Sequence, residues 1–276
     1  MLNPLLYKNV IEVRKEVPGT AHCPLKVLTS DIEEYYSKTP KDQSPELSII
    51  KEFLCTYLLQ CWNLKTPEIV ALLIDPSIIN IKLSPHHKKN YFSRTCFGSK
   101  ILEPILELNA ITSISNKYEY NKFSNPVDLL KIGLFDIWVA NDDRKPSNTN
   151  ILLKEGENGF ILYAIDHAFT FSSMSFVDLN PSFEPEAPYN DSILDTSLAQ
   201  EIIKIALKED IHLLKYINEY FDSAVSICHE NFLYITDNIP KDLGLSSQCI
   251  SALERFLFSK SRNKLVFTEF CRRFIL

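Results

Sequence analysis

The feature that most constrains this chain is a polar segment that runs directly into two strand-like stretches. The segment reads NDDRKPSNTN, residues 141–150, and continues as ILLKEGENGFILYAID. Apolar residues lie on both sides of a glycine-containing turn at Glu155–Gly159, which is typical of a β-hairpin. Because a hairpin folds its two ends together, we expect Asn148 and Asn150 to lie opposite the stretch that ends at Asp166. The sequence therefore predicts carboxylates and carboxamides gathered at one end of a hairpin.

The gathered side chains are the oxygen ligands that Mg²⁺ prefers. Asp142 and Asp143 precede the hairpin, and Asp166 ends it. Mg²⁺ usually takes one or two carboxylates together with the phosphates of a substrate. We therefore expect Asp166 and either Asn148 or Asn150 to be metal ligands. Two adjacent aspartates alone would also suit a plain turn, but the spacing of all these residues together favours a functional site.

The spacing matches the catalytic loop of protein kinases, which reads D-x-K-P-x-N. In that loop the Asp receives the proton of the substrate hydroxyl, while an Asn and a later Asp hold Mg²⁺ on the phosphates of ATP. Asp143, Lys145 and Asn148 stand at these positions. Asn150 directly precedes the strand, as the ligand Asn does in kinases, so we slightly favour it over Asn148. Asp143 is the expected catalytic base. Lys145 either neutralises charge on the transferred phosphoryl group or is an exposed loop lysine.

A longer stretch resembles a known family. WVANDDRKPSNTNILL and AIDHAFTF are similar to the HipA-like kinases, specifically the small stand-alone bacterial domain whose loop reads D-R-x-P-x-N-x-N-L-L followed by I-D-H. The resemblance spans roughly residues 15–170, and the last hundred residues match only in being helical. It implies a bilobal, protein-kinase-like α+β fold, ATP and Mg²⁺ as cofactors, and Ser or Thr of a protein as acceptor. The association of this family with toxin–antitoxin systems implies a separate antitoxin-like partner.

The resemblance also assigns residues for the nucleotide. YYSK resembles the strand that carries the nucleotide lysine, here Lys38, and KEFLCTYLLQCWNLKTPEI resembles the helix whose glutamate pairs with it, here Glu52. Glu52 shares a helical stripe with apolar residues, so we expect it to be half-buried and to need a partner. Without the resemblance, Lys38 reads as a surface lysine. Gly19, in EVPGTAHC, suits a tight turn between two early strands, and we expect it beside the nucleotide.

Some positions depart from the protein-kinase pattern. Asn141 replaces the His that precedes the catalytic Asp by two residues, which the HipA-like pattern allows. Ala168 replaces the Gly of the metal-binding D-F-G motif. We expect this change to restrict the backbone after Asp166, because only Gly freely adopts positive φ. His167 is expected to be structural, and Arg144 to support the loop through a buried ion pair.

Residue patterns also predict the organisation of the chain. Strands and one long helix are expected before residue 75, forming an antiparallel sheet that carries the helix. Residues 75–125 show no clear pattern, and the chain reads as helical from Thr196 onward. We expect an N-lobe over residues 1–78 and a mainly helical C-lobe over 79–276. The segment 174–195 stands where kinases carry their activation segment, and its serines lie among acidic residues. We expect it to be mobile, and phosphorylation there to lower activity.

Composition excludes several other classes of protein. The six glycines form neither G-x-G-x-x-G nor a P-loop. A net charge of −6 gives no argument for nucleic acid or an anionic membrane, and no apolar run approaches the ~18 residues of a membrane span. The N-terminus has no features of a signal peptide, and seven scattered cysteines suggest thiols in a reducing cytoplasm. The alternatives to a cytoplasmic protein kinase are a nucleotide-binding pseudokinase and a kinase of small molecules or lipids.

Overall fold

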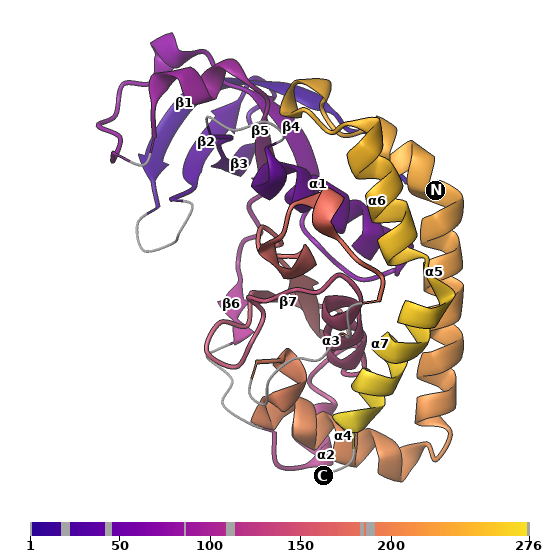
Figure 1. Ribbon diagram of the computed structural model, residues 1–276. Helices are drawn as coiled ribbons and strands as arrows, with labels where there is room; N and C mark the ends of the chain where they lie inside the picture. The colour runs from indigo at the N-terminus through magenta and orange to yellow at the C-terminus, as the bar shows by residue number, and fades with distance from the viewer. Residues whose placement is uncertain are drawn as a thin grey trace.

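The structure, a computed structural model, describes residues 2–17, 23–41, 46–85, 87–108, 114–182, 185 and 191–274. A small lobe contains a strand barrel and a long helix, and a larger lobe contains most of the helices and a three-stranded sheet (Figure 1). The predicted bilobal α+β architecture is therefore confirmed.

The strands of the small lobe close into a barrel in the order β1-β2-β3-β5-β4. Four of the five pairings are antiparallel, as the sequence predicts, but β1 and β4 run parallel, with Tyr7 opposite Ala71. The side chains of Leu25 and Val27 on β2 point into the barrel and are fully buried. The strands are β1 (Tyr7–Glu16), β2 (Leu25–Thr29), β3 (Glu34–Lys38), β4 (Ile69–Leu73) and β5 (Cys96–Lys100).

The strand β5 lies in the stretch that has no clear sequence pattern. It pairs with both β3 and β4, so it completes the barrel. Gly98 on β5 faces Val70, and a Cβ atom at this position would lie within 2.8 Å of the Val70 side chain. The expected division at residues 78 and 79 separates β5 from the strands it pairs with. We therefore propose that the first lobe extends to Lys100.

The helix α1 (Leu47–Cys61) joins the cores of the two lobes. Nearly all of its residues are buried, as expected of a helix that is covered on every side. Phe53 meets Phe97 of the barrel edge to face, with 5.0 Å between ring centroids. Trp62, which follows the helix, meets Phe135 and Phe221 of the large lobe at 5.3 and 5.6 Å. Glu52 projects from α1 between the lobes.

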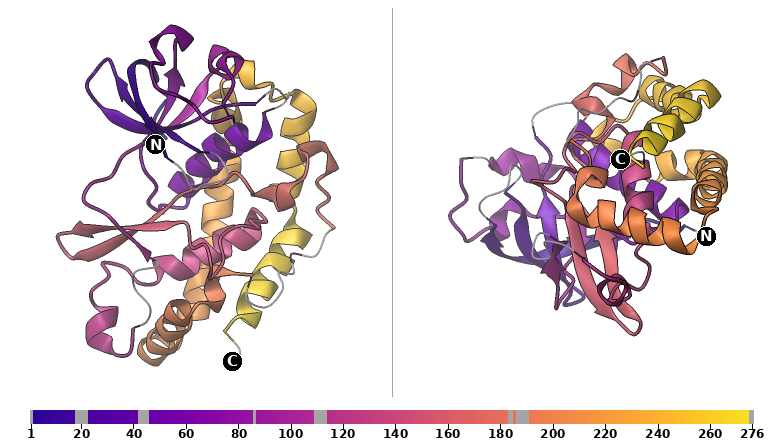
Figure 2. Two further views of the ribbon diagram at one scale, coloured as in Figure 1. Left: turned by 90° about the vertical axis from the view of Figure 1, so that its left-hand side faces the viewer. Right: turned by 90° about the horizontal axis from the view of Figure 1, so that it is seen from below.

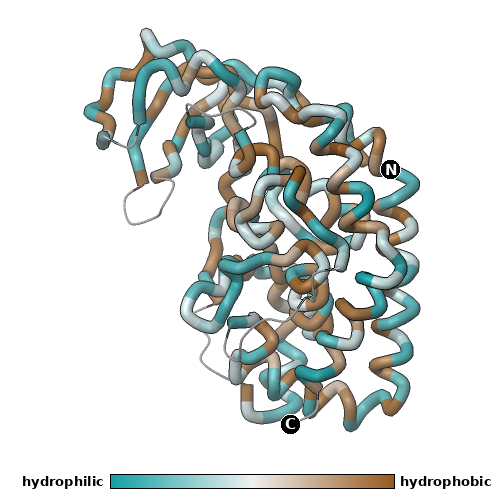
Figure 3. Tube along the Cα trace, viewed as in Figure 1, coloured by the Kyte–Doolittle hydropathy of each residue, from teal (hydrophilic) through white to brown (hydrophobic). Residues whose placement is uncertain are grey.

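The helix α3 (Asp128–Trp138) is buried along almost its whole length, and α4 (Ser197–Glu209) and α7 (Lys260–Arg272) pack against it. The helix α5 (Leu213–Asp237) has 25 residues and runs along one side of the molecule (Figures 1 and 2). Its buried residues recur every three or four positions, so apolar and polar positions alternate along the tube in Figure 3. The remaining α-helices described in this lobe are α2 (Lys117–Tyr120) and α6 (Ser247–Leu257).

The predicted hairpin is present in the large lobe. It consists of β7 (Ile151–Gly156) and β8 (Gly159–Ala164), and Ile151 lies opposite Ala164. The short strand β6 (Leu106–Glu107) pairs with the outer edge of β7. This register brings residues 148–150 close to residues 165–166, as the sequence predicts.

The segment after Asp166 forms short 3₁₀ turns against the large lobe at Phe171–Ser173, Phe176–Asp178 and Ile193–Asp195. Within the stretch 174–195, the side chains of Phe176, Ile193 and Leu194 are fully buried. Residues 183–184 and 186–190 lie outside the described residues. The expected mobility of this stretch, and the effect of phosphorylation there, stay predictions.

Contacts between the α5–α6 corner (residues 238–243) and the small lobe hold the two lobes together (Figure 1). The backbone N–H of Leu5 donates to Asn238 Oδ1 at 3.2 Å, and that of Thr95 donates to Asp242 Oδ2 at 2.6 Å. The backbone N–H of Glu46 donates to the carbonyl oxygen of Leu243 at 2.9 Å. Among the helices described, none has the length and apolarity that crossing a membrane requires.

Candidate active site

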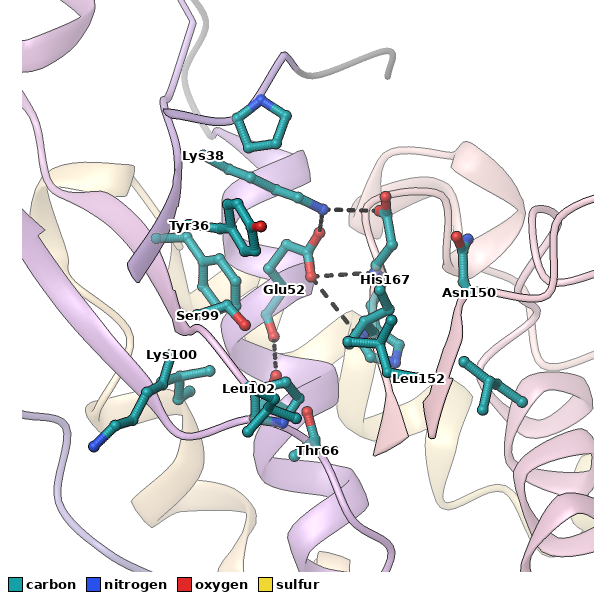
Figure 4. Close-up of a pocket in the computed structure, with 18 of the residues that line it drawn as sticks. Tyr36, Lys38, Glu52, Thr66, Ser99, Lys100, Leu102, Asn150, Leu152 and His167 are labelled. Carbon is teal, nitrogen blue, oxygen red and sulfur yellow. Dashed lines mark hydrogen bonds and ion pairs between the residues drawn. The ribbon is translucent and has the colours of Figure 1, made fainter. Parts of the chain in front are cut away.

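A pocket of about 360 Å³ lies between the two lobes (Figure 4). Residues of β3 and β5, of the hairpin, and of the connection between the lobes line it. Both apolar and polar side chains line it. The apolar ones include Ile69, Phe97, Leu102, Ile151 and Ile165, and the polar ones include Lys38, Glu52, Asn148, Asn150 and Asp166. This combination suits a ligand with an apolar ring and a charged end.

Lys38 reaches from β3 to the two carboxylates on the far side of the pocket. Its ammonium group pairs with Glu52 Oε1, and its Nζ atom lies 2.9 Å from Asp166 Oδ1. Figure 4 shows the Lys38 and Glu52 side chains pointing toward one another. Glu52 is only 1% exposed, so it is more deeply buried than the sequence indicates. The structure therefore brings together the lysine and the glutamate that the resemblance assigns to the nucleotide.

Burial and charge act in opposite directions on this pair. Burial disfavours the charged form of Lys38, but the carboxylates of Glu52 and Asp166 outweigh it and raise the pKa of Lys38 above its ordinary value. Burial likewise disfavours ionised Glu52, but Lys38 and the hydrogen bond from His167 lower the pKa of Glu52 well below its ordinary value. Both groups are therefore charged at neutral pH, and Lys38 presents a fixed positive charge to the pocket.

Asp143 lies just behind the pocket and is held by the two candidate asparagines. The side-chain amides of Asn148 and Asn150 both donate to Asp143 Oδ2, at 2.9 and 3.0 Å. The backbone N–H of Asp143 donates to Asn141 Oδ1 at 3.1 Å. Both asparagines therefore position the expected base, and their Oδ1 atoms face away from it.

Lys145 lies at the start of a tight turn in the same loop. Its backbone N–H and C=O bond to the C=O and N–H of Asn148, at 3.1 and 2.9 Å. The Lys145 side chain is half-exposed. Lys145 is not among the described residues that line the pocket, and its role as a phosphoryl-contacting cation stays a proposal.

Arg144 supports the loop through a buried ion pair, as the sequence predicts. Its guanidinium pairs with Asp136 of α3 and donates to the carbonyl oxygen of Ile165 at 2.7 Å. Burial raises the pKa of Asp136, and the charge of Arg144 opposes that rise. His167 is buried beside Arg144, with 3.2 Å between its Nε2 and Arg144 Nη2, and its expected structural role stays a prediction.

The expected strain at Ala168 is absent. Positive φ falls instead on Asp166, at 57°, and on Asn150, at 47°. Asp and Asn tolerate the left-handed conformation better than other residues with side chains. The reversal of the chain therefore takes place at the aspartate itself, and Ala168 fits its position because its backbone does not need the freedom of glycine.

Comparisons with known proteins agree with this geometry. The family model for HipA-like kinases matches residues 10–248. The chain belongs to the HipA-like kinase family. It is therefore a kinase with the ATP-binding fold of that family. No match was found among curated proteins.

Solved structures show the same fold as this HipA-like kinase. The proinflammatory kinase CtkA of Helicobacter pylori is similar with a TM-score of 0.57 and 13% identity, over 99% of this chain and 98% of CtkA. Two further solved structures are less similar. One is the Rio2 kinase of Chaetomium thermophilum in an ADP/Mg²⁺–phosphoaspartate complex, with a TM-score of 0.39 and 14% identity over 96% of this chain and 71% of that one. The other is a Golgi casein kinase with Mn/ADP bound, with a TM-score of 0.45 and 11% identity over 98% of this chain and 73% of that one.

The residues of this HipA-like kinase fit a divalent cation that is held partly by phosphates. Asp166 Oδ1 is buried, and the cation described beside it is the ammonium group of Lys38, 2.9 Å away. Within the described residues, no three His, Cys, Asp or Glu side chains form a complete metal site. One carboxylate supplemented by carboxamides and phosphates is what Mg²⁺ accepts.

Several residues of the site carry no motif signal. Asp136 is buried inside an apolar helix, and a lone acid in the run GLFDIWV is the signal that could have identified it. Lys51 is buried on α1, where burial lowers its pKa to about 8 and the charge of Asp142 opposes the shift. The residues that β5 contributes to the pocket depend on pairing that sequence periodicity does not reveal. Gly19 lies outside the described residues.

Proposed function

We propose that this HipA-like kinase transfers the γ-phosphoryl group of ATP to a Ser or Thr hydroxyl of a protein, with Mg²⁺ as the metal. The observation that carries the proposal is the placement of Asp143. It is held by two amides at the edge of a pocket that also presents Lys38 and Asp166. This placement supports assigning parts of the family's kinase activity to Asp143, Lys38 and Asp166.

Asp143 has the geometry of a base for the acceptor hydroxyl. Both asparagine amides donate to its Oδ2, and no described group donates to its Oδ1. Oδ1 can therefore accept the hydrogen bond of an incoming hydroxyl and take its proton as the phosphoryl group is transferred. Two donors on the other oxygen fix the direction in which the carboxylate faces.

Lys38 has the geometry of a phosphate contact. Its ammonium group is held by buried Glu52 and faces the polar end of the pocket. Asp166 and either Asn150 or Asn148 would hold Mg²⁺, which when bound offsets the charge that develops on the transferred phosphoryl group. Lys145, half-exposed on the loop, would contact that phosphoryl group from the acceptor side.

The acceptor and partner are inferred from the family resemblance. A Ser/Thr protein acceptor is the first candidate, and the separate antitoxin-like partner and the cytoplasmic location stay predictions. The decisive test is incubation with labelled ATP and Mg²⁺, alone and with cell lysate, followed by mass spectrometry of labelled molecules. Label on Ser or Thr of a protein supports the proposal, whereas label confined to a lipid or small molecule, or no label at all, contradicts it.

Two variants of adjacent aspartates provide a matched control. Asp143→Ala should abolish labelling, because it removes the base. Asp142→Asn should preserve labelling within about tenfold, because the Asp142 carboxylate interacts with Ser173 and Lys51, whereas the two asparagine amides donate to Asp143. Equal losses in the two variants would show that the loop as a whole is disturbed and that Asp143 has no special role.

A further inference from the structure

A chain of buried contacts links the nucleotide lysine to the expected base, and His167 lies at its centre. The upper half starts at Glu52. One of its carboxylate oxygens, Oε1, pairs with Lys38. The other, Oε2, accepts the backbone N–H of His167 at 3.1 Å and lies 3.7 Å from the Nδ1 atom of the same residue. A shift of α1 therefore moves Lys38 and His167 together.

The lower half runs from His167 to the catalytic loop. Its Nε2 lies 3.2 Å from Arg144 Nη2, and Arg144 pairs with Asp136 Oδ1. The same oxygen of Asp136 accepts the side-chain amide of Asn141 at 2.8 Å. Asn141 Oδ1 in turn accepts the backbone N–H of Asp143 at 3.1 Å. The chain of contacts therefore ends on the backbone of the expected base.

The direction of the hydrogen bonds fixes the proton on His167. Arg144 can only donate, so His167 Nε2 must accept, and the ring proton lies on Nδ1, which faces Glu52. Burial lowers the pKa of His167 and Arg144 adds to the shift, while Glu52 and Asp136 oppose it. The ring of His167 thus directs its Nδ1–H donor toward the Glu52 carboxylate and its Nε2 acceptor toward the Arg144 guanidinium.

We propose that His167 is a positioning residue that couples the Lys38–Glu52 pair on α1 to the loop carrying Asp143. The proposal rests on the function proposed above for Asp143. Glu52, His167 and Arg144 are each about 1% exposed, so water screens their contacts little. Placement of the nucleotide lysine and alignment of the base then depend on one another through the backbone N–H and the ring of His167.

Two substitutions separate this polar role from simple filling of space. His167→Gln keeps a donor and an acceptor, and His167→Leu removes both at similar size. We expect kcat to stay within about threefold of wild type in the Gln variant and to fall by about tenfold or more in the Leu variant, because small misplacements of catalytic groups cost up to ~10²-fold. The ATP dissociation constant should change by less than about threefold in both, because the backbone N–H of His167 still bonds to Glu52. Equal kcat values for Leu and Gln would overturn the proposal.

Hydrogen exchange tests the coupling without any turnover. Glu52→Gln weakens the upper end of the chain, and the exchange rate of peptides covering Asn141–Arg144 reports on the lower end. In the wild-type background, Glu52→Gln should raise the exchange rate of these peptides. In the His167→Leu background, adding Glu52→Gln should cause no further rise. The same added rise in both backgrounds would overturn the proposal.

Controls keep this experiment decisive. If His167→Leu does not fold, as judged by circular dichroism, His167→Phe replaces it, because Phe keeps a ring and removes both nitrogens. If wild-type protein labels no acceptor, the proposed function fails, and the exchange experiment still decides whether His167 couples α1 to the loop.

Discussion

Replacing Glu52 with Gln should lower the free energy of unfolding by about 2 kcal/mol at neutral pH. Removing one partner of a buried ion pair typically costs ~3–5 kcal/mol. Two features of this site reduce that cost. Asp166 Oδ1 lies 2.9 Å from Lys38 Nζ, so the lysine keeps a counter-charge. The Gln side-chain oxygen can also still accept the backbone N–H that His167 donates to Glu52 Oε2.

The effect should depend on pH in a direction that the ion pair sets. Burial opposes the ionised form of Glu52, but Lys38 and His167 outweigh it, so the folded-state pKa lies below the ordinary 4.5. A carboxyl group with a depressed pKa stabilises the fold fully above its unfolded pKa, and this stability is lost as pH falls toward the folded-state pKa. The difference between wild type and Glu52→Gln should therefore be constant above about pH 5 and shrink below it.

Urea denaturation at stepped pH from 7 to 3.5 measures this difference directly. Glu68→Gln is the matched control, because Glu68 is 53% exposed and lies 3.9 Å from Lys100. An exposed pair contributes only ~0–1 kcal/mol, so the control should track wild type. If the curves for wild type and Glu52→Gln stay parallel down to pH 3.5, Glu52 is not an ionised carboxylate stabilised by Lys38, and the reasoning is wrong.

Three further predictions concern single side chains. Asp143→Ala should lower kcat by ~10²–10⁴-fold with little loss of ATP affinity, and retention of more than about a tenth of kcat would show that Asp143 is not the base. Asp166→Asn should weaken Mg²⁺-dependent ATP binding in calorimetry, and an equal Mg²⁺ dependence in mutant and wild type would remove Asp166 from the metal site. Lys51→Met should raise the melting temperature at neutral pH, because burial lowers the pKa of Lys51 to about 8 and so disfavours its charged form. That gain should vanish as pH rises from 8 toward the ordinary pKa of 10.5, and a gain that persists there would contradict this account.

The catalytic loop and the hairpin could be predicted from the sequence because both are local. The residues from Asp143 to Asn150 are neighbours in the chain, and the register of β7 with β8 follows from one short turn. The Lys38–Glu52 pair could be predicted only through the family resemblance, because no spacing rule relates a strand to a helix that follows it.

Other parts of the fold depend on contacts between distant segments. The strand β5 is five residues long, and only its pairing with β3 and β4 distinguishes it from the loops around it. The positive φ falls on Asp166, two residues before the Ala168 that replaces the motif glycine, and the residue types in the motif alone do not indicate this position. The sequence predicts a buried ion pair for Arg144, but only the fold identifies Asp136 of α3 as its partner.

The corner at residues 238–243 determines how the two lobes can move. The lobes are joined covalently along the connection after Lys100, and Leu5, Glu46 and Thr95 tie the small lobe to this corner by hydrogen bonds. A rotation that opens the cleft must therefore preserve these attachments and the packing of Trp62 against the large lobe, or break the hydrogen bonds at the corner first. The energy barrier to nucleotide release would then include breaking hydrogen bonds at this corner, which is remote from the pocket. Substitutions at Asp242 would change the dissociation rate of the nucleotide without contacting it.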